Sequence, residues 1–172
     1  MRVFIPATHS MLADFARDGV LPIRSGVVFG LTQAVRDFYT SGDDEELEYT
    51  AFLDAARASL RLLATEDASG AEEKFPNRRV VLAADIPDAN LTADPTGGDS
   101  VLRVEPAQLE LTQLRAIHTD DEDAEAATQR AKECIDDADL GDEDAELALG
   151  DCEDNLMSWY DSKELGVLVD LM

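Results

Sequence analysis

A continuous apolar run in the middle of the chain, residues 80–84, most constrains what this sequence can fold into. Short apolar runs of this kind are typical of strands that are buried on both faces of a sheet. Asp85 closes the run, and Pro87 prevents its continuation. The rest of the chain must therefore cover both faces of a sheet, which favours a layered fold over a helical bundle.

Other segments with strand composition alternate with helical ones. The strand-like segments are 2–5, 101–104, 116–118 and 156–160, and residues 21–29 fit either a loop or a short strand. This order predicts an α/β (or α+β) fold with a single mixed sheet of four to five strands covered by helices. Apolar strands followed by helices also suggest that the sheet is partly parallel.

The longest expected helix opens with four acids, residues 43–46, and runs to about Thr65. Acids in a first turn suit the positive end of the helix dipole. Its apolar stripe consists of Tyr49, Phe52, Leu53, Ala56, Leu60 and Leu63. Shorter helices are expected from Ser10 to Gly19, after Thr32, from Pro106 to Leu114, and after Asp161 or Ser162. Residues 65–77 and 88–100 are expected to be loops.

The composition indicates a globular protein. A chain of 172 residues fits one domain, 1–172, and can bury enough surface to fold without disulfides. Its two cysteines, Cys134 and Cys152, are expected to be reduced and structural. We find no apolar segment of signal-peptide or membrane-spanning length, so we expect a cytoplasmic protein.

The net charge of −24 limits the partners that the chain can bind. Nucleic acids and anionic membranes are disfavoured, because both are bound through Lys and Arg. A basic protein or a divalent cation remains as a partner. Residues 119–155 contain 16 acids and 2 bases, a net of −14, so the charge is concentrated in the C-terminal third.

The acidic third keeps helical apolar stripes, which predicts acidic helices rather than a disordered tail. One stripe contains Ala124, Ala127, Ala131, Cys134 and Ile135, and the next contains Leu140, Ala145, Leu147, Ala148 and Cys152. The acids of the second helix form a candidate interaction face: Asp142, Glu143, Asp144, Asp151, Glu153 and Asp154. Such a face either docks a basic partner or only keeps the protein in solution.

Both histidines of the chain follow expected strands. If the strands near 3–5, 80–84 and 116–118 are parallel, their carboxyl ends meet at one edge, where ligands of open α/β sheets bind. His9, Asp85, His118 and Asp120 would then lie together as an acid–base or metal site. The alternative is two unrelated histidines and aspartates that serve turns or helix caps. Trp159 and Tyr160 either anchor the last strand or form the aromatic wall of a pocket or an interface.

Several segments also resemble a known family. They are 2–8 (Arg-Val-Phe-Ile-Pro-Ala-Thr), 47–49, 54–63, 83–88, 139–146 and Trp159-Tyr160. Together they are similar, nearly end to end, to a family of small acidic actinobacterial proteins with no assigned function. The resemblance implies a shared fold and cytoplasmic residence, and it carries over no activity.

The sequence contains no motif that specifies a reaction, and it identifies neither a cofactor nor an oligomeric state. Our hypothesis is a non-enzymatic binding protein that presents its acidic face to a basic partner. The alternative is a small enzyme or metal-binding protein that uses the His/Asp group at the sheet edge.

Overall fold

The apolar run forms strand β4 (Val80–Asp85), which lies inside a sheet between β1 (Arg2–Ala7) and β8 (Leu114–Thr119). The computed structural model describes residues 1–70 and 75–171. Val80, Leu82 and Ala84 pack into the core on one face of the sheet, and Val81 and Ala83 pack into the core on the other. This alternation follows from the two-residue period of a strand. The prediction that the run is covered on both faces is confirmed.

The main sheet has seven strands in the order β5-β6-β3-β1-β4-β8-β9, and every neighbouring pair is antiparallel. Its remaining strands are β3 (Val27–Gly30), β5 (Leu91–Ala93), β6 (Val101–Val104) and β9 (Ser158–Asp161). β2 (Val20–Pro22) and β7 (Gln108–Glu110) form a separate two-stranded sheet. The mixed α and β composition is confirmed. The predicted strand number and the partly parallel arrangement are wrong, because a buried run shows burial and not direction.

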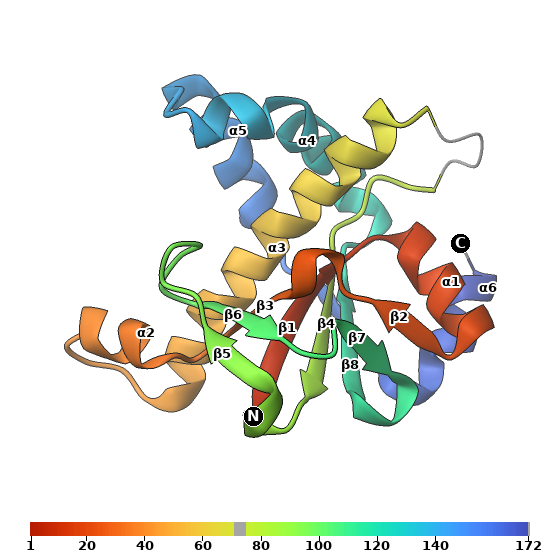
Figure 1. Cartoon of the computed structure of the whole chain (residues 1–172). Helices are drawn as coiled ribbons and strands as arrows, with labels where there is room; N and C mark the ends of the chain where they lie inside the picture. Colours follow the sequence, from red (N-terminus) through yellow and green to blue (C-terminus); the bar gives the residue numbers. More distant parts are fainter. Residues whose placement is uncertain (71–74, 172) are drawn as a thin grey trace.

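Helices cover both faces of the main sheet (Figure 1). The α-helices in the described part of the chain are α1 (His9–Asp18), α2 (Gln33–Phe38), α3 (Asp44–Ala68), α4 (Glu125–Asp139), α5 (Glu143–Glu153) and α6 (Leu165–Asp170). Short 3₁₀ turns occupy Arg24–Gly26, Asp88–Asn90, Leu111–Gln113, Glu122–Ala124 and Ser162–Glu164. α3 crosses one face of the sheet, whereas α1, α6 and the β2–β7 pair cover the other.

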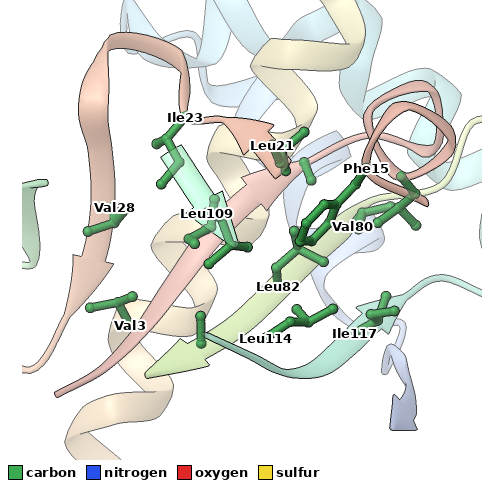
Figure 2. Packing of buried hydrophobic residues seen from close by; sticks show 14 of the residues in the cluster. Val3, Phe15, Leu21, Ile23, Val28, Val80, Leu82, Leu109, Leu114 and Ile117 are labelled. Carbon is green, nitrogen blue, oxygen red and sulfur yellow. The ribbon is translucent and has the colours of Figure 1, made fainter. Parts of the chain in front are cut away.

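The core opposite α3 is the larger of the two sheet cores (Figure 2). Phe15 of α1 and Leu82 of β4 meet there, together with Leu21 and Leu109 of the two-stranded sheet. The prediction of a helix from Pro106 to Leu114 is wrong, because residues 108–110 form strand β7. Leu109 is buried because it belongs to β7, where it pairs with Leu21 across the β2–β7 ladder.

Helix α3 begins as the sequence predicts, with a capping box between Asp43 and Glu46. Ala56, Leu60 and Leu63 of its expected apolar stripe are buried, as predicted, but the rest of the buried stripe is rotated from the expected one. Ala51, Ala55 and Ser59 face the sheet, whereas Tyr49 is exposed and Phe52 and Leu53 are half-buried. The small residues allow the helix to approach the strands closely. Ser59 Oγ donates to the Ala7 carbonyl at 2.7 Å and accepts from the Val80 N–H at 3.0 Å.

The two predicted acidic helices are present as α4 and α5; α4 packs against α3, α5 packs mainly against α4, and all three helices share one core. Leu60, Leu63, Ile135, Leu149 and Cys152 are among the residues that form this third core. Leu140 and Leu147, which the sequence places on the buried stripe, are instead 88% and 69% exposed. Both cysteines are free, as expected, and burial raises the pKa of the Cys152 thiol.

Two helix boundaries also differ from expectation. Thr8 rather than Ser10 caps α1, and its hydroxyl accepts from the Met11 N–H. α3 continues to Ala68, beyond Thr65, so the expected loop at 65–77 is shorter. Residues 71–74 of that loop lie outside the described residues. Gly19 ends α1 and Thr32 caps α2, as the sequence predicts.

Candidate functional site

The antiparallel topology changes which of the predicted site residues can meet. Because β4 runs opposite to β1 and β8, its first residue lies beside their last residues: Val80 pairs with both Ala7 and Thr119. His9 and Asp120 follow β1 and β8, so both lie at this edge of the sheet. Asp85 ends β4 and therefore lies at the opposite edge, where it pairs with Arg2.

His9 is buried at the start of α1, and its Nε2 lies 2.9 Å from Oγ1 of Thr119. Burial, and to a smaller extent the charge of Arg78, lower the pKa of His9 to about 4, and the charge of Asp120 opposes both effects. The imidazole is therefore neutral near pH 7. In this position His9 joins the first helix to the end of β8.

The carboxylate of Asp120 is hydrogen-bonded to an arginine and is not available to a ligand. Arg79 donates to its two carboxylate oxygens from Nε at 2.9 Å and from Nη2 at 2.7 Å, and the Arg79 backbone N–H adds a bond of 2.8 Å. Thr128 of α4 donates to the same carboxylate at 3.1 Å. Arg79 Nη2 also donates to the Asn155 carbonyl at 2.9 Å. The pair thus ties β4, β8, α4 and the chain after α5 together.

Asp85 binds two arginines at the other edge of the sheet. It accepts from Arg2 Nε at 2.8 Å and from Arg115 Nε at 2.9 Å. The hydrogen bond from Arg2 contributes most to lowering the pKa of Asp85, so the carboxylate stays charged. The grouping of Asp85 with the other three residues depended on parallel strands, and the antiparallel sheet separates them.

His118 lies near the same edge as His9 but faces α3. Its ring meets the Phe52 ring edge to face, with centroids 4.9 Å apart. Burial lowers the pKa of His118, and the charge of Arg2 adds to this effect. Among residues 1–70 and 75–171, no cluster of three or more His, Cys, Asp or Glu side chains could hold a metal ion.

The acids of α5 fall into two groups with different local roles. Asp142 caps the helix by accepting from the Ala145 N–H at 2.9 Å, and Glu143 and Asp144 occupy the first turn. There the helix dipole stabilises negative charge. These three acids are accounted for by helix formation alone, even though Glu143 and Asp144 are also exposed.

The acids at the C-terminal end of α5 interact unfavourably with the negative end of the helix dipole. Asp151 and Glu153 lie in the last turn of α5, and Asp154 is its C-cap. Within residues 143–153 of this helix, the last turn contains no basic residue. Glu153 forms an ion pair with Arg57 of α3, with 3.6 Å between Oε1 and Nε. Arg57 Nη2 also lies 2.7 Å from Oε2 of Glu146. Asp151 and Asp154 are exposed, and within the described ranges their carboxylates form no ion pair.

An exposed leucine lies among these acids. Leu147 is 69% exposed, and helical spacing places Glu143 and Asp151 one turn before and one turn after it. We define the acidic face as the six predicted acids with Leu147 between them. A protein–protein interface places such an apolar side chain inside a polar rim, and single exposed leucines are also common on other protein surfaces.

A second feature, which the sequence only partly indicated, surrounds His118. A pocket of about 360 Å³ is lined by Phe4, Glu45, Glu48, Tyr49, Phe52, His118, Leu156 and Met157, and we call it the aromatic pocket. Trp159 is the cross-strand partner of His118, so it projects from the same face of the sheet, and it is 59% exposed. Tyr160 packs against the core opposite α3. Tyr160 thus anchors β9, whereas Trp159 stands beside the pocket.

No helix in the described ranges is both long enough and apolar enough to cross a membrane. Comparisons with known proteins found no match among curated proteins and none among solved structures. A family model does match residues 1–169, which is nearly the whole chain, and its description is a family of unknown function (DUF6912). The chain therefore belongs to this family of unknown function.

Proposed function

We propose that this chain is a cytoplasmic, non-enzymatic binding protein whose acidic face docks a basic protein partner, and that it is of actinobacterial origin, as the sequence resemblance implies. The observation that carries the docking proposal is the pair Asp151 and Asp154. Each opposes the α5 dipole at a cost of roughly 0.3–1 kcal/mol, and helix formation does not account for either. Binding of a cationic surface would offset that cost.

The distribution of the arginines supports the same conclusion. Arg57 and Arg61 of α3 reach the acidic helices and bond Glu146 and Asp139. These bonds hold α3 against α4 and α5. They leave the outer carboxylates of α5 to solvent, so the acids that face outward are available to a partner.

The alternative, an enzyme or metal-binding protein, has less support from the geometry. Asp120 accepts four hydrogen bonds from Arg79 and Thr128, and Asp85 accepts one from each of two arginines. A divalent cation would have to displace these bonds before either carboxylate could bind it.

Differential capture tests the proposal. We would compare the wild-type protein with D151K/D154K and with the matched control E105K/D170K, which makes the same charge change at exposed acids outside the acidic face. Captured proteins would be identified at about 0.1 M and about 1 M salt, where the screening length falls from about 10 Å to about 3 Å.

We expect a basic protein that the wild-type chain and the control retain at low salt and that D151K/D154K loses. Retention of the same proteins by all three forms would contradict the proposal. So would capture that does not depend on salt.

A further inference from the structure

The aromatic pocket lies between the N-terminal half of α3 and the end of β8, outside the acidic face of α5. Phe52 is at its centre. The Phe52 ring meets Phe4 and His118 edge to face, at centroid distances of 5.8 Å and 4.9 Å, and lies nearly parallel to the Tyr49 ring at 5.7 Å. Such a distance between parallel rings implies a lateral offset, so both rings leave part of their π faces uncovered.

The charges at this pocket are all of one sign. Glu45, Glu48, Tyr49 and Phe52 are spaced as i, i+3, i+4 and i+7, so two carboxylates and two rings share one face of α3. The residues that line the pocket include no Lys or Arg. His118 is neutral near pH 7 because burial lowers its pKa, and the nearby Arg2 is bonded to Asp85.

This combination selects a ligand that is both cationic and partly apolar. Ring faces attract organic cations through their quadrupole, and nearby carboxylates strengthen that attraction. An anion would be repelled by Glu45 and Glu48, and a small hydrated metal ion would gain nothing from the rings.

We propose that the aromatic pocket binds the side chain of a lysine or arginine. Both side chains combine an apolar stem with a charged head. The stem would pack on Leu156 and Met157, and the head would lie over Tyr49 and Phe52 between the two glutamates. A volume of about 360 Å³ admits one such side chain.

The source of this side chain is the basic protein partner, and this part of the inference rests on the proposed function. Asp154, at the end of the acidic face, is followed within three residues by Leu156 and Met157 of the pocket. The bond from Arg79 to the Asn155 carbonyl holds the connecting chain in place. A basic segment that docks on the end of α5 therefore reaches the pocket without leaving the protein surface.

The test uses small probes, so that it does not depend on an identified partner. Butylguanidinium and butylammonium represent the two side chains, and butanol and butyrate supply the same stem with a neutral or an anionic end. Binding to the whole protein would be followed by NMR at the Met157 methyl group and at the Phe52 and His118 rings. We expect both cations to shift these signals, with butanol at least about threefold weaker and butyrate inactive.

Variants separate the pocket from general charge attraction. E45Q/E48Q is expected to weaken cation binding about threefold to fivefold and to leave butanol unchanged. The control E105Q/D170N removes the same charge elsewhere and should bind as wild type. D151K/D154K should also bind the probes as wild type, so a failure of this inference is distinguishable from a failure of the acidic face.

Three results would overturn the inference. Butanol could bind as tightly as the cations, or E45Q/E48Q could bind them as tightly as wild type. The same signals could also shift with protein concentration in the absence of any probe, which would show that a second copy of the chain occupies the pocket.

Discussion

Arg79 and Asp120 form a two-pronged ion pair in the interior, with bonds of 2.9 Å and 2.7 Å, although each side chain is at most 2% exposed. Neither charge faces water, so each depends on the other and on the surrounding hydrogen bonds. The pair links the start of β4 to the end of β8 and to the chain that follows α5. It makes this edge of the sheet a structural junction.

Replacement of Asp120 by Asn is expected to destabilise the fold by about 3–5 kcal/mol, because it leaves the Arg79 charge buried without a counter-charge. D85N weakens two exposed ion pairs at the opposite edge and should lower the free energy of unfolding by about 1 kcal/mol or less. Urea denaturation of both variants measures the difference. Equal effects would show that the buried pair is not the junction described here.

The stability of the protein should fall on acidification partly through His9. Its pKa is about 4 when folded and about 6.5 when unfolded, so between these values the unfolded chain binds the additional proton. The contribution of neutral His9 to the free energy of unfolding is therefore complete above pH 6.5 and is lost as the pH falls towards 4. This contribution to the free energy of unfolding is at most about 3–4 kcal/mol.

NMR titration of the two histidine rings gives the folded pKa values directly. Comparing wild type with H9Q then shows how much of the pH dependence of unfolding belongs to His9, and the variant should have the shallower dependence. A His9 ring that titrates near 6.5 would contradict the burial that the structure shows.

Charge reversal at the two ends of α5 should affect stability in opposite directions. D151K/D154K replaces acids that oppose the dipole and should raise the free energy of unfolding by about 0.3–1 kcal/mol per charge. E143K/D144K replaces acids of the first turn and should lower it by a similar amount. Thermal unfolding at low salt measures both. Loss of stability in D151K/D154K would mean that these acids have a structural partner.

Substitution of two leucines of α5 should distinguish an effect on partner binding from an effect on stability. Leu149 is fully buried in the third core, and L149A should cost about 2–5 kcal/mol of stability. Leu147 is exposed, so L147A should change stability by no more than about 0.5 kcal/mol while weakening partner capture. If L147A is as destabilising as L149A, the leucine is not part of a docking surface.

The parts of the fold that the sequence predicts are those with a strong local signal. The run at 80–84 gives β4, and the acids at 43–46 give the start of α3. β5 and β7 have three residues each, too few for a periodic pattern, and they were expected to be a loop and a helix. Strand direction has no local signal, so the antiparallel order could not be read. The assignment of residues 1–172 to one domain stays a prediction.

The candidate sites show the same limit. The acids of α5 can be identified in the sequence, but the structural role of each acid depends on which end of the helix it occupies. The aromatic pocket combines His118 with rings of α3 about seventy residues earlier, and only the sheet register brings them together. The i, i+3 spacing of Tyr49 and Phe52 was visible, although it indicated a buried stripe rather than a pocket.

The central claim is that the acidic face, and not the acidity of the whole chain, binds cationic partners. NMR mapping of an oligolysine peptide on the isotope-labelled protein tests it most directly. Outside the aromatic pocket, we predict that the largest shifts fall on residues 147–154, that they diminish as salt is raised, and that D151K/D154K loses them while E105K/D170K keeps them. Shifts of equal size at the acids of α4, α5 and the C-terminal half of α3, unchanged by D151K/D154K, would contradict the account.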